Sequence, residues 1–382
     1  MSHVVGKKST LTWAVHLSLL VLVLLWVFPT AGLLVSSFRT ADQISTGGWW
    51  KSLTPSTQNL TLRTAPSSEQ QEVDGLYVLE GNLFESRGAS DISVWGVSSR
   101  EIDSFVPGDT AEFRKGGAVT VQANGDYRVE HSEPLTGKRG SRIFVTATQP
   151  PEFTLENYKH VLFNPRNSEG MAKAFFNTFT VTIPATIIPI LVAAFAAYAL
   201  AWMDFPGRAL LIACVVALLV VPLQLALIPL LRLHNEIGIG KGYLGVWLAH
   251  TGFGLPLAIY LLRNYMVGLP KDIIENARVD GATEFHIFTK IILPLSFPAL
   301  ASFAIFQFLW VWNDLLVALV FLIDSSGDTT VMTRRIVELL GTRGGNWEIL
   351  ATSAFVSIAV PLVVFFAMQR YLVRGLLAGS VK

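Results

Sequence analysis

Long apolar runs alternate with short polar connections along this chain. Six runs are long enough for a helix that crosses a bilayer, whose hydrocarbon core of about 30 Å needs roughly 20 apolar residues. They cover residues 11–37, 174–202, 209–231, 244–266, 295–323 and 350–371. Several contain proline, which membrane helices tolerate when neighbouring groups satisfy the carbonyls that it leaves free. The pattern predicts an all-α polytopic membrane protein with six transmembrane helices.

A polar insert, residues 38–172, separates the first apolar run from the second. Short apolar stretches alternate with turn residues inside it, at 75–79, 92–97, 118–122 and 142–147. Asn124-Gly125, between two apolar stretches, is typical of a two-residue hairpin turn. We expect a small β-rich domain here. Residues 51–72, rich in Ser, Thr, Pro and Gln, are predicted to form a loose linker.

The short loops predict the orientation of the chain in the membrane. Ten Lys and Arg residues lie in the termini and short loops on the side of the N-terminus, against five in the short loops opposite. Basic loops stay in the cytoplasm, whereas a long loop translocates largely regardless of its charge. We therefore expect cytoplasmic termini and an insert outside. The first run is longer than the apolar region of a signal peptide, which favours an uncleaved anchor.

The composition supports a membrane protein and excludes other classes. Hydrophobic residues make up 51% of the chain and charged residues 15%, against about a quarter charged in a typical soluble domain. A net charge of +1 gives no electrostatic footprint for nucleic acid. The single cysteine, Cys214, excludes an intramolecular disulfide and a multi-cysteine metal site. The sequence has no nucleophile–base or metal constellation at a recognisable spacing, so neither an enzyme nor a cofactor is expected.

The connection between the fourth and fifth runs, residues 267–294, has a distinctive pattern. Pro270 suits the first turn of a short amphipathic helix over 271–279, and Gly281 supplies the backbone freedom for a reversal after it. Ile273, Ile274 and Ala277 share one face of this helix. That face needs a covering surface, and a groove on another protein is one candidate. Apolar residues 285, 288, 291 and 292 predict a second helix.

This connection resembles the cytoplasmic "EAA" loop of ABC importer permeases, the inner-membrane components of binding-protein-dependent transport systems. Glu275-Asn276-Ala277, Gly281 and the Ile-Ile-Leu-Pro ending at residues 291–294 carry the resemblance, with Asn276 departing at the middle position. The segment 153–158 is similar to the entry segment of the carbohydrate branch, and the segments 312–314 and 375–382 are similar to its maltose-type second permease subunit. A long insert after the first span is similar to α-glucoside transport permeases.

The resemblance implies a permease core over residues 173–382 in a bacterial inner membrane, with the insert 38–172 in the periplasm and residues 1–37 as tail and first span. It implies a second permease subunit, two ATPase subunits and a periplasmic sugar-binding protein as partners, and an α-glucoside such as maltose, sucrose or trehalose as substrate. The chain has no Gly-x4-Gly-Lys-Ser/Thr phosphate loop, so ATP would bind to the partner ATPase. The residues implied in coupling to the ATPase are Glu275, Ala277, Arg278, Asp280 and Gly281.

Polar and aromatic residues inside the fifth run are candidates for the sugar pathway, because an Asp at the centre of a span costs roughly 2.5–3.5 kcal/mol. Sugars stack on aromatic faces and hydrogen-bond to amides and carboxylates. The candidates are Gln307, Trp310, Trp312, Asn313 and Asp314. Alternatively, the tryptophans anchor the helix at the membrane interface and Asn313 bonds a neighbouring helix.

Two other functions remain open from the sequence. A secondary sugar transporter would show repeated halves and intramembrane charges for ion coupling, and dependence of uptake on ATP rather than a proton gradient would discriminate. A membrane-anchored sensor would use the outer domain to bind its ligand, and would leave the loop around Glu275 and Gly281 without a role.

Overall fold

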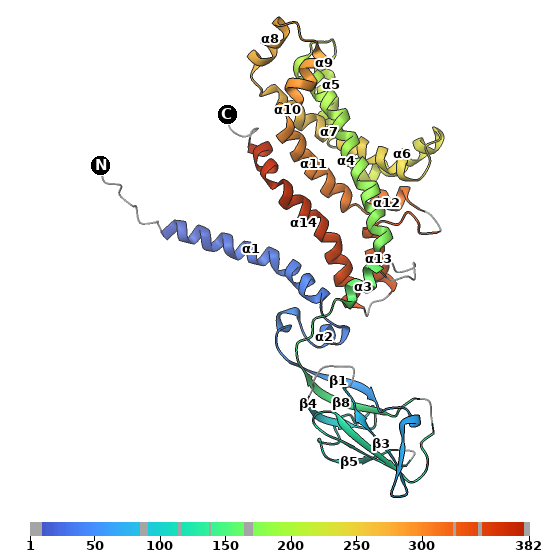
Figure 1. Cartoon of the computed structure of the whole chain (residues 1–382). Helices are drawn as coiled ribbons and strands as arrows, with labels where there is room; N and C mark the ends of the chain where they lie inside the picture. The colour runs from blue at the N-terminus through green and yellow to red at the C-terminus, as the bar shows by residue number, and fades with distance from the viewer. Residues whose placement is uncertain are drawn as a thin grey trace, which may run out of the picture. The chain divides into compact units, whose positions relative to one another are not determined.

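The computed structural model describes residues 10–84, 91–113, 116–136, 139–163, 171–323, 326–342 and 346–377 (Figure 1). The chain divides into two compact units, one of residues 1–157 with 346–352 and one of residues 158–345 with 353–382. The basic residues at 7, 8, 343 and 382 that entered the orientation argument, and most of the predicted C-terminal motif 375–382, lie outside the described residues.

The first unit begins with helix α1, Thr10–Ser37, which matches the first predicted span. Only 6% of its most apolar 18-residue stretch is buried inside the protein, as expected for a helix that faces lipid. A short helix α2, Ala41–Thr46, follows. Thr40 and Gln43 form a reciprocal capping box at its start. A single 3-10 turn, η1, covers Trp49–Lys51.

The insert folds into a β-sandwich, as the alternating pattern predicted. Its strands are β1 (Ser56–Arg63), β2 (Gln71–Val73), β3 (Leu76–Asn82), β4 (Asp91–Gly96), β5 (Thr110–Glu112), β6 (Ala118–Val121), β7 (Asp126–His131) and β8 (Arg142–Gln149), with a 3-10 turn η2 at Ser67–Glu69. They form two antiparallel sheets in the orders β1-β8-β4 and β2-β3-β7-β6-β5. Side chains of both sheets share one core around Trp95, which is fully buried.

Two local features of the insert test the sequence predictions. The Asn124-Gly125 turn joins β6 to β7 with Val121 paired to Tyr127, so the predicted hairpin is confirmed. The predicted loose linker over 51–72 is wrong, because β1 pairs with β8 along eight residues there. Residues in β1 alternate between buried and exposed, with Leu60 and Leu62 in the core. The intervening polar residues lie on the solvent-facing side of the sheet. Because half of the strand is polar, its composition resembles that of a linker.

The entry and exit of the insert are tied together at the end of α1. The amide of Asn157 donates to the carbonyl oxygens of Ser37 and Arg39, both at 2.9 Å. The backbone N–H of Thr154 donates to the Phe38 carbonyl at 2.7 Å. These bonds satisfy carbonyls that the end of a helix leaves without intrahelical partners.

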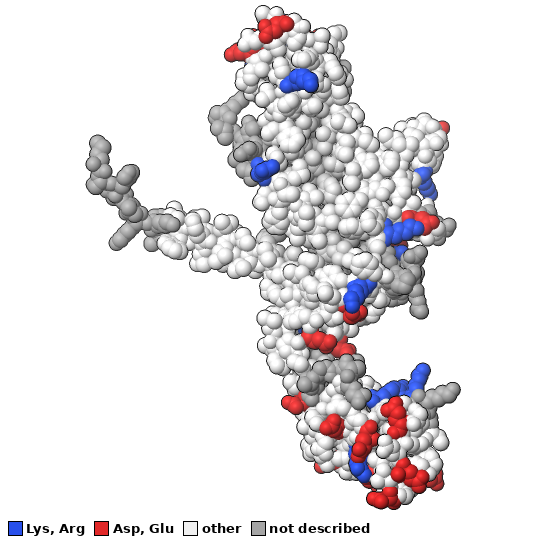
Figure 2. Space-filling model, viewed as in Figure 1, with Lys and Arg blue, Asp and Glu red and all other residues white. Residues whose placement is uncertain are grey.

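The second unit is helical. Its elements are α3 (Glu156–Phe163, which starts within the first unit), α4 (Met171–Trp202), α5 (Arg208–Leu218), α6 (Leu223–Glu236), α7 (Tyr243–Val267), α8 (Lys271–Val279), α9 (Glu284–Ile287), the π-helical segment η3 (Phe288–Ile292), α10 (Leu293–Leu295), α11 (Phe297–Trp312), α12 (Leu316–Phe321), α13 (Met332–Thr342) and α14 (Trp347–Leu377). Long stretches of helical surface carry no charged side chain in Figure 2, whereas the β-sandwich carries many.

Among the described residues, four helices are long and apolar enough to cross a membrane, namely α1, α4, α7 and α14. Two further predicted spans are bent rather than straight. The α5–α6 pair bends by 110°, just before Pro222, and the pair formed by residues 284–295 and 297–312 bends by 70°. The predicted spans over 209–231 and 295–323 are therefore not single straight helices: the first is interrupted at residues 219–222, between α5 and α6, and the second at residues 313–315, between α11 and α12.

Proline chemistry explains where these helices break. Pro222 and Pro294 have no N–H to donate to the preceding turn, and the ring of proline clashes with the carbonyl four residues earlier. The backbone responds with a break before α6 and with the widened π turn of η3, which ends two residues before Pro294. A further break follows α11, at residues 313–315.

Small residues allow α4, α7 and α11 to pack closely. Ala193, Ala194 and Ala197 of α4 are at most 2% exposed in one apolar cluster. Gly254 of α7 lies directly against α11, because a Cβ there would come 2.7 Å from the side-chain oxygen of Gln307. Close backbone approach through small residues is the usual way in which membrane helices associate.

Candidate functional site

Helix α8 lies where the EAA resemblance predicts it, over Lys271–Val279. Ile274 and Ala277 are buried, at 1% and 9% exposure, against an apolar cluster that includes Ile287 and Phe288. The chain's own helices therefore cover this face, rather than a partner's groove. Ile273, predicted on the same face, is 41% exposed. The surface left for a partner is consequently the opposite one.

Three apolar side chains on or shortly after α8 are exposed. Ile273, Val279 and Phe285 are 41%, 86% and 67% exposed. Phe285 was predicted to belong to the packed side of the second helix, but only Phe288 and Ile292 of that set are buried. The acidic side chain of Glu275 is exposed between these apolar residues in the sequence. A protein interaction site would require that such apolar residues form a contiguous patch.

Arg278 connects α8 to two other helices. Its Nε donates to Oε1 of Glu284 at 2.9 Å, and its Nη2 donates to the carbonyl of Trp202 at 3.2 Å. The hydroxyl of Tyr198, near the end of α4, donates to Oε2 of the same Glu284 at 2.5 Å. The hydrogen bond to Glu284 raises the pKa of Arg278. We call Tyr198, Arg278 and Glu284 the coupling triad.

The turn after α8 requires the glycine that the motif provides. Gly281 has φ +80°, and nothing lies within 4 Å of the position that a Cβ would occupy. Its constraint is therefore conformational rather than steric. Asp280 is exposed at the C-cap of α8. The backbone N–H of Ala282 closes the turn by donating to the carbonyl of Ala277 at 3.0 Å.

Sequence reasoning named Arg278 but missed its partners Tyr198 and Glu284. Glu284 is the first residue of α9, where Thr283 caps the helix and a carboxylate is favoured by the helix dipole. That signal was present in the Thr-Glu sequence. Tyr198 is 86 residues away along the chain, so only the packing of α4 against this loop could reveal it.

Two of the candidate pathway residues are buried between helices. Gln307 is 1% exposed and its Nε2 donates to the carbonyl oxygens of Ala185 and His250, at 3.1 and 3.4 Å. Trp312 is also 1% exposed, and its Nε1 donates to the carbonyl of Ser357 at 2.9 Å. In this conformation both side chains hold helices together and are not accessible to a solute.

The other three candidates lie at the end of α11. Trp310 is 41% exposed, and Asn313 is exposed with its Nδ2 donating to the carbonyl of Leu309 at 2.8 Å. Asp314 accepts from the backbone N–H of Ala318 at 3.2 Å, which caps α12. Trp310 and Asn313 are therefore the accessible members of the set.

Three further buried threonines, on the two helices that Gln307 bonds, were not anticipated. Thr182 and Thr186 of α4 and Thr251 of α7 are at most 7% exposed, and their hydroxyls have no partner among the described atoms. Thr178, Thr182 and Thr186 recur every four residues, which places them on one face of α4. This spacing was the available sequence signal for a polar stripe inside the helix bundle.

The part of the chain that the structure describes holds no group of three or more His, Cys, Asp or Glu side chains suited to a metal ion. His250 Nε2 lies 3.8 Å from Oδ2 of Asp314. Among the described residues, no third His, Cys, Asp or Glu joins this pair to form a possible metal site.

Comparisons with known proteins find similarity to transport permeases. Residues 175–377 match the family described as binding-protein-dependent transport system inner membrane component. The chain is 61% identical, over 99% of both chains, to the alpha-glucoside transport system permease protein AglG of Rhizobium meliloti (strain 1021). It is 60% identical over 240 residues, 63% of this chain and 79% of the other, to the osmoprotective compounds uptake permease protein GgtD of Synechocystis sp.. A crystal structure of a bacterial ABC transporter that imports alginate aligns with 59% of this chain and 81% of its own, at TM-score 0.48 and 20% identity.

Proposed function

Since this chain belongs to the family of binding-protein-dependent transport system inner membrane components, we propose that it carries α-glucosides, such as maltose, sucrose or trehalose, into a bacterial cell. The observation that carries this proposal is the identity of 61% to an α-glucoside permease over nearly the whole of both chains. Family membership makes the protein a permease subunit of the inner membrane and not an enzyme. It sets aside the secondary-transporter and sensor hypotheses.

The proposed assembly contains a second permease subunit, two ATPase subunits and a periplasmic sugar-binding protein. The exposed apolar residues Ile273, Val279 and Phe285 form the proposed ATPase contact, with Glu275 and Asp280 beside them. Closure of the ATPase dimer would move α8. The coupling triad would pass this movement to α4 and α9, so that the spans alternate between inward-open and outward-open states.

The proposed topology has six spans, and contacts along α4 support it. At the C-terminal end of α4, Arg208 of α5 donates to the carbonyl of Leu200 at 2.9 Å. At the N-terminal end, Tyr243 of α7 donates to Oδ1 of Asn177 at 3.0 Å. The chain between these two contacts, which contains the bent α5–α6 pair, therefore runs from one end of α4 toward the other. Helix α4 is roughly 48 Å long at 1.5 Å per residue.

The second bent pair covers the same distance. Glu284, before the bend, bonds Tyr198 near the C-terminal end of α4. Asp328, beyond α12, forms an ion pair with Lys173 at the N-terminal end. With cytoplasmic basic loops, as the positive-inside rule favours, α8 faces the ATPase and the insert faces the periplasm.

Within the pathway, we assign direct sugar contacts to Trp310 and Asn313, which are exposed. An exposed aromatic face and an amide provide the stacking and hydrogen bonding that a sugar needs. Gln307, Trp312 and Asp314 would position them, because their side chains bond neighbouring helices or cap α12.

Reconstitution of the four-component importer in proteoliposomes tests the substrate. We expect maltose, sucrose or trehalose, delivered by the binding protein, to stimulate ATP hydrolysis and ATP-dependent uptake, and the β-linked disaccharide cellobiose to do neither. Uptake that follows a proton gradient without ATP, or equal stimulation by cellobiose, would contradict the proposal.

An osmoprotective compound is the second candidate substrate, because the permease GgtD is 60% identical over 240 residues. Adding glycine betaine to the same substrate panel separates the two candidates. Stimulation by glycine betaine with no response to any α-glucoside would favour the second.

A further inference from the structure

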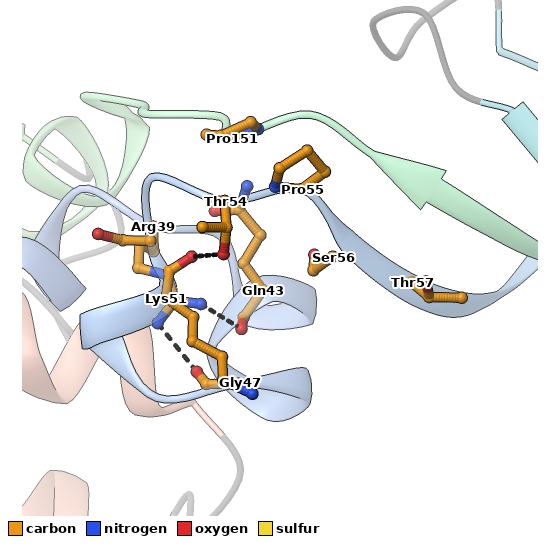
Figure 3. Close-up of a pocket in the computed structure, with 10 residues that line it drawn as sticks. Arg39, Gln43, Gly47, Lys51, Thr54, Pro55, Ser56, Thr57 and Pro151 are labelled. Carbon is orange, nitrogen blue, oxygen red and sulfur yellow. Dashed lines mark hydrogen bonds between the residues drawn. The ribbon is translucent and has the colours of Figure 1, made fainter.

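A polar cavity of about 200 Å³ lies in the first unit, directly after the end of α1 (Figure 3). Its described lining combines two cationic side chains with hydroxyl and amide groups, and no lining residue is acidic. The chemically important residues are Arg39, Gln43, Lys51, Ser52, Thr54 and Ser56. Such a lining is complementary to an anion that carries several oxygen acceptors.

Arg39 is the buried part of this lining, at 4% exposure. Its Nη1 donates to the carbonyl of Gly47 at 3.0 Å and its Nη2 to the carbonyl of Gln43 at 2.6 Å. Its Nε is buried and has no hydrogen-bond partner among the described atoms. Burial lowers the pKa of this guanidinium, which means that its charged form is desolvated. The carbonyls hold the side chain in place but do not neutralise its charge.

The neighbouring 3-10 turn η1 sets the position of the cavity along the axis of α1. The Trp49 ring packs on Phe28 of α1, with ring centroids 4.6 Å apart. It also lies against Gly32, where a Cβ would come 2.5 Å from the indole nitrogen. Gly32 is five residues before the end of α1 at Ser37, or about 7.5 Å along the helix.

The turn and the residues that follow it also expose apolar side chains near α1, the first candidate membrane span. Trp50 is 65% and Leu53 78% exposed, and only 6% of the apolar window of α1 is covered by protein. Tryptophan favours the boundary between lipid headgroups and acyl chains. Lysine near a helix end extends its charge toward the headgroups. If α1 crosses the bilayer, the cavity at its end would lie at the level of the lipid headgroups.

We propose that this cavity binds the phosphate group of an anionic phospholipid. In that arrangement Arg39 and Lys51 neutralise the phosphate, the hydroxyl group of Ser52 donates to one of its oxygens, and Trp50 and Leu53 contact the acyl chains. An anionic lipid would offset the cost of the buried Arg39 charge. The inference rests on α1 crossing the bilayer, and depends neither on the transported substrate nor on the orientation of the chain.

The test uses the purified assembled importer, stripped of lipid in detergent and supplied with phosphatidylglycerol or phosphatidylcholine. Native mass spectrometry measures the lipid retained by this subunit. We expect phosphatidylglycerol to be retained in preference to phosphatidylcholine. We expect retention to fall about five-fold in Lys51→Gln and in Arg39→Lys. Arg100→Gln removes an exposed positive charge elsewhere in the insert and should match the unmodified protein.

Lys51→Gln keeps the test decisive if Arg39→Lys fails to fold, because the Lys51 side chain is exposed. Equal retention of phosphatidylglycerol by the unmodified protein, Lys51→Gln and Arg100→Gln would overturn the proposal. Displacement of the lipid by millimolar inorganic phosphate would identify a soluble anion as the ligand instead. A loss of stimulation by the binding protein in Lys51→Gln, with lipid retention unchanged, would assign the cavity to protein docking. Sugar-stimulated ATP hydrolysis is recorded separately, so failure of the substrate proposal is distinguishable.

Discussion

At the scale of single residues, Gly254 is the glycine of the described helical unit at which an added Cβ would come closest to a neighbour. A Cβ there would lie 2.7–3.0 Å from three atoms of the Gln307 amide. That amide is 1% exposed and holds α11 to backbone carbonyls of α4 and α7. Gly254→Ala should therefore displace Gln307 and destabilise the subunit by about 1–3 kcal/mol, the usual cost of overpacking.

Gly252→Ala is the matched control on the same helix, since nothing lies within 4 Å of its added Cβ. Thermal unfolding of both variants in detergent measures the difference. Gly252→Ala should be neutral or slightly more stable, because alanine favours a helix by roughly 0.5–1 kcal/mol over glycine. Equal melting temperatures for the two variants would contradict this account of the packing.

The sequence could predict which residue types matter, but not always how they are used. A Gln inside an apolar run was named as a candidate for the sugar pathway, whereas its amide donates to the helix carbonyls of Ala185 and His250, which no local pattern reveals. Likewise, Arg278 follows from its place in the motif, whereas Tyr198 joins it only through folding. Local rules identify candidates, and tertiary contacts assign their partners.

At the scale of elements, the coupling triad predicts a specific defect. Arg278→Gln and Glu284→Gln each remove the 2.9 Å ion pair between α8 and α9. Both side chains are over 40% exposed, so the loss is about 1 kcal/mol after allowing for solvent screening. Transport per ATP hydrolysed should fall by roughly five-fold in each variant, while the subunit still assembles.

A double-mutant cycle distinguishes a shared interaction from two independent ones. The Arg278→Gln, Glu284→Gln double variant should lose little more transport than either single variant. Lys271→Gln, which removes an exposed charge at the start of the same helix, is the control and should transport normally. Additive losses in the double variant would refute the idea that the pair acts as a unit.

Elements with a strong local signal were predicted well, and those controlled by distant contacts were not. The amphipathic α8, its glycine turn and four of the sandwich strands follow from spacing and turn chemistry. Strand β1 escaped because its polar outer face resembles a linker, although β8 pairs with it along its whole length. The bends at α5–α6 and around residue 296 depend on how proline is accommodated within the bundle.

At the scale of the whole molecule, the open question is whether each bent pair crosses the membrane. Contacts at the two ends of α4 supply the physical argument. Arg208 and Glu284 meet one end of α4, while Tyr243 and Asp328 meet the other. A re-entrant pair would return to the end from which it started, and these contacts do not have that arrangement.

Single-cysteine labelling tests this topology directly, because Cys214 is the chain's single cysteine and Cys214→Ser gives a clean background. A membrane-impermeant maleimide on intact spheroplasts should label Asp103→Cys in the insert and Lys241→Cys between α6 and α7. It should label Asp204→Cys and Asp280→Cys only after lysis. Six spans require Asp204 and Lys241 on opposite sides, since the α5–α6 pair lies between them. Labelling of both from the same side would show that this pair is re-entrant, and would place α8 outside the cell, where no ATPase could reach it.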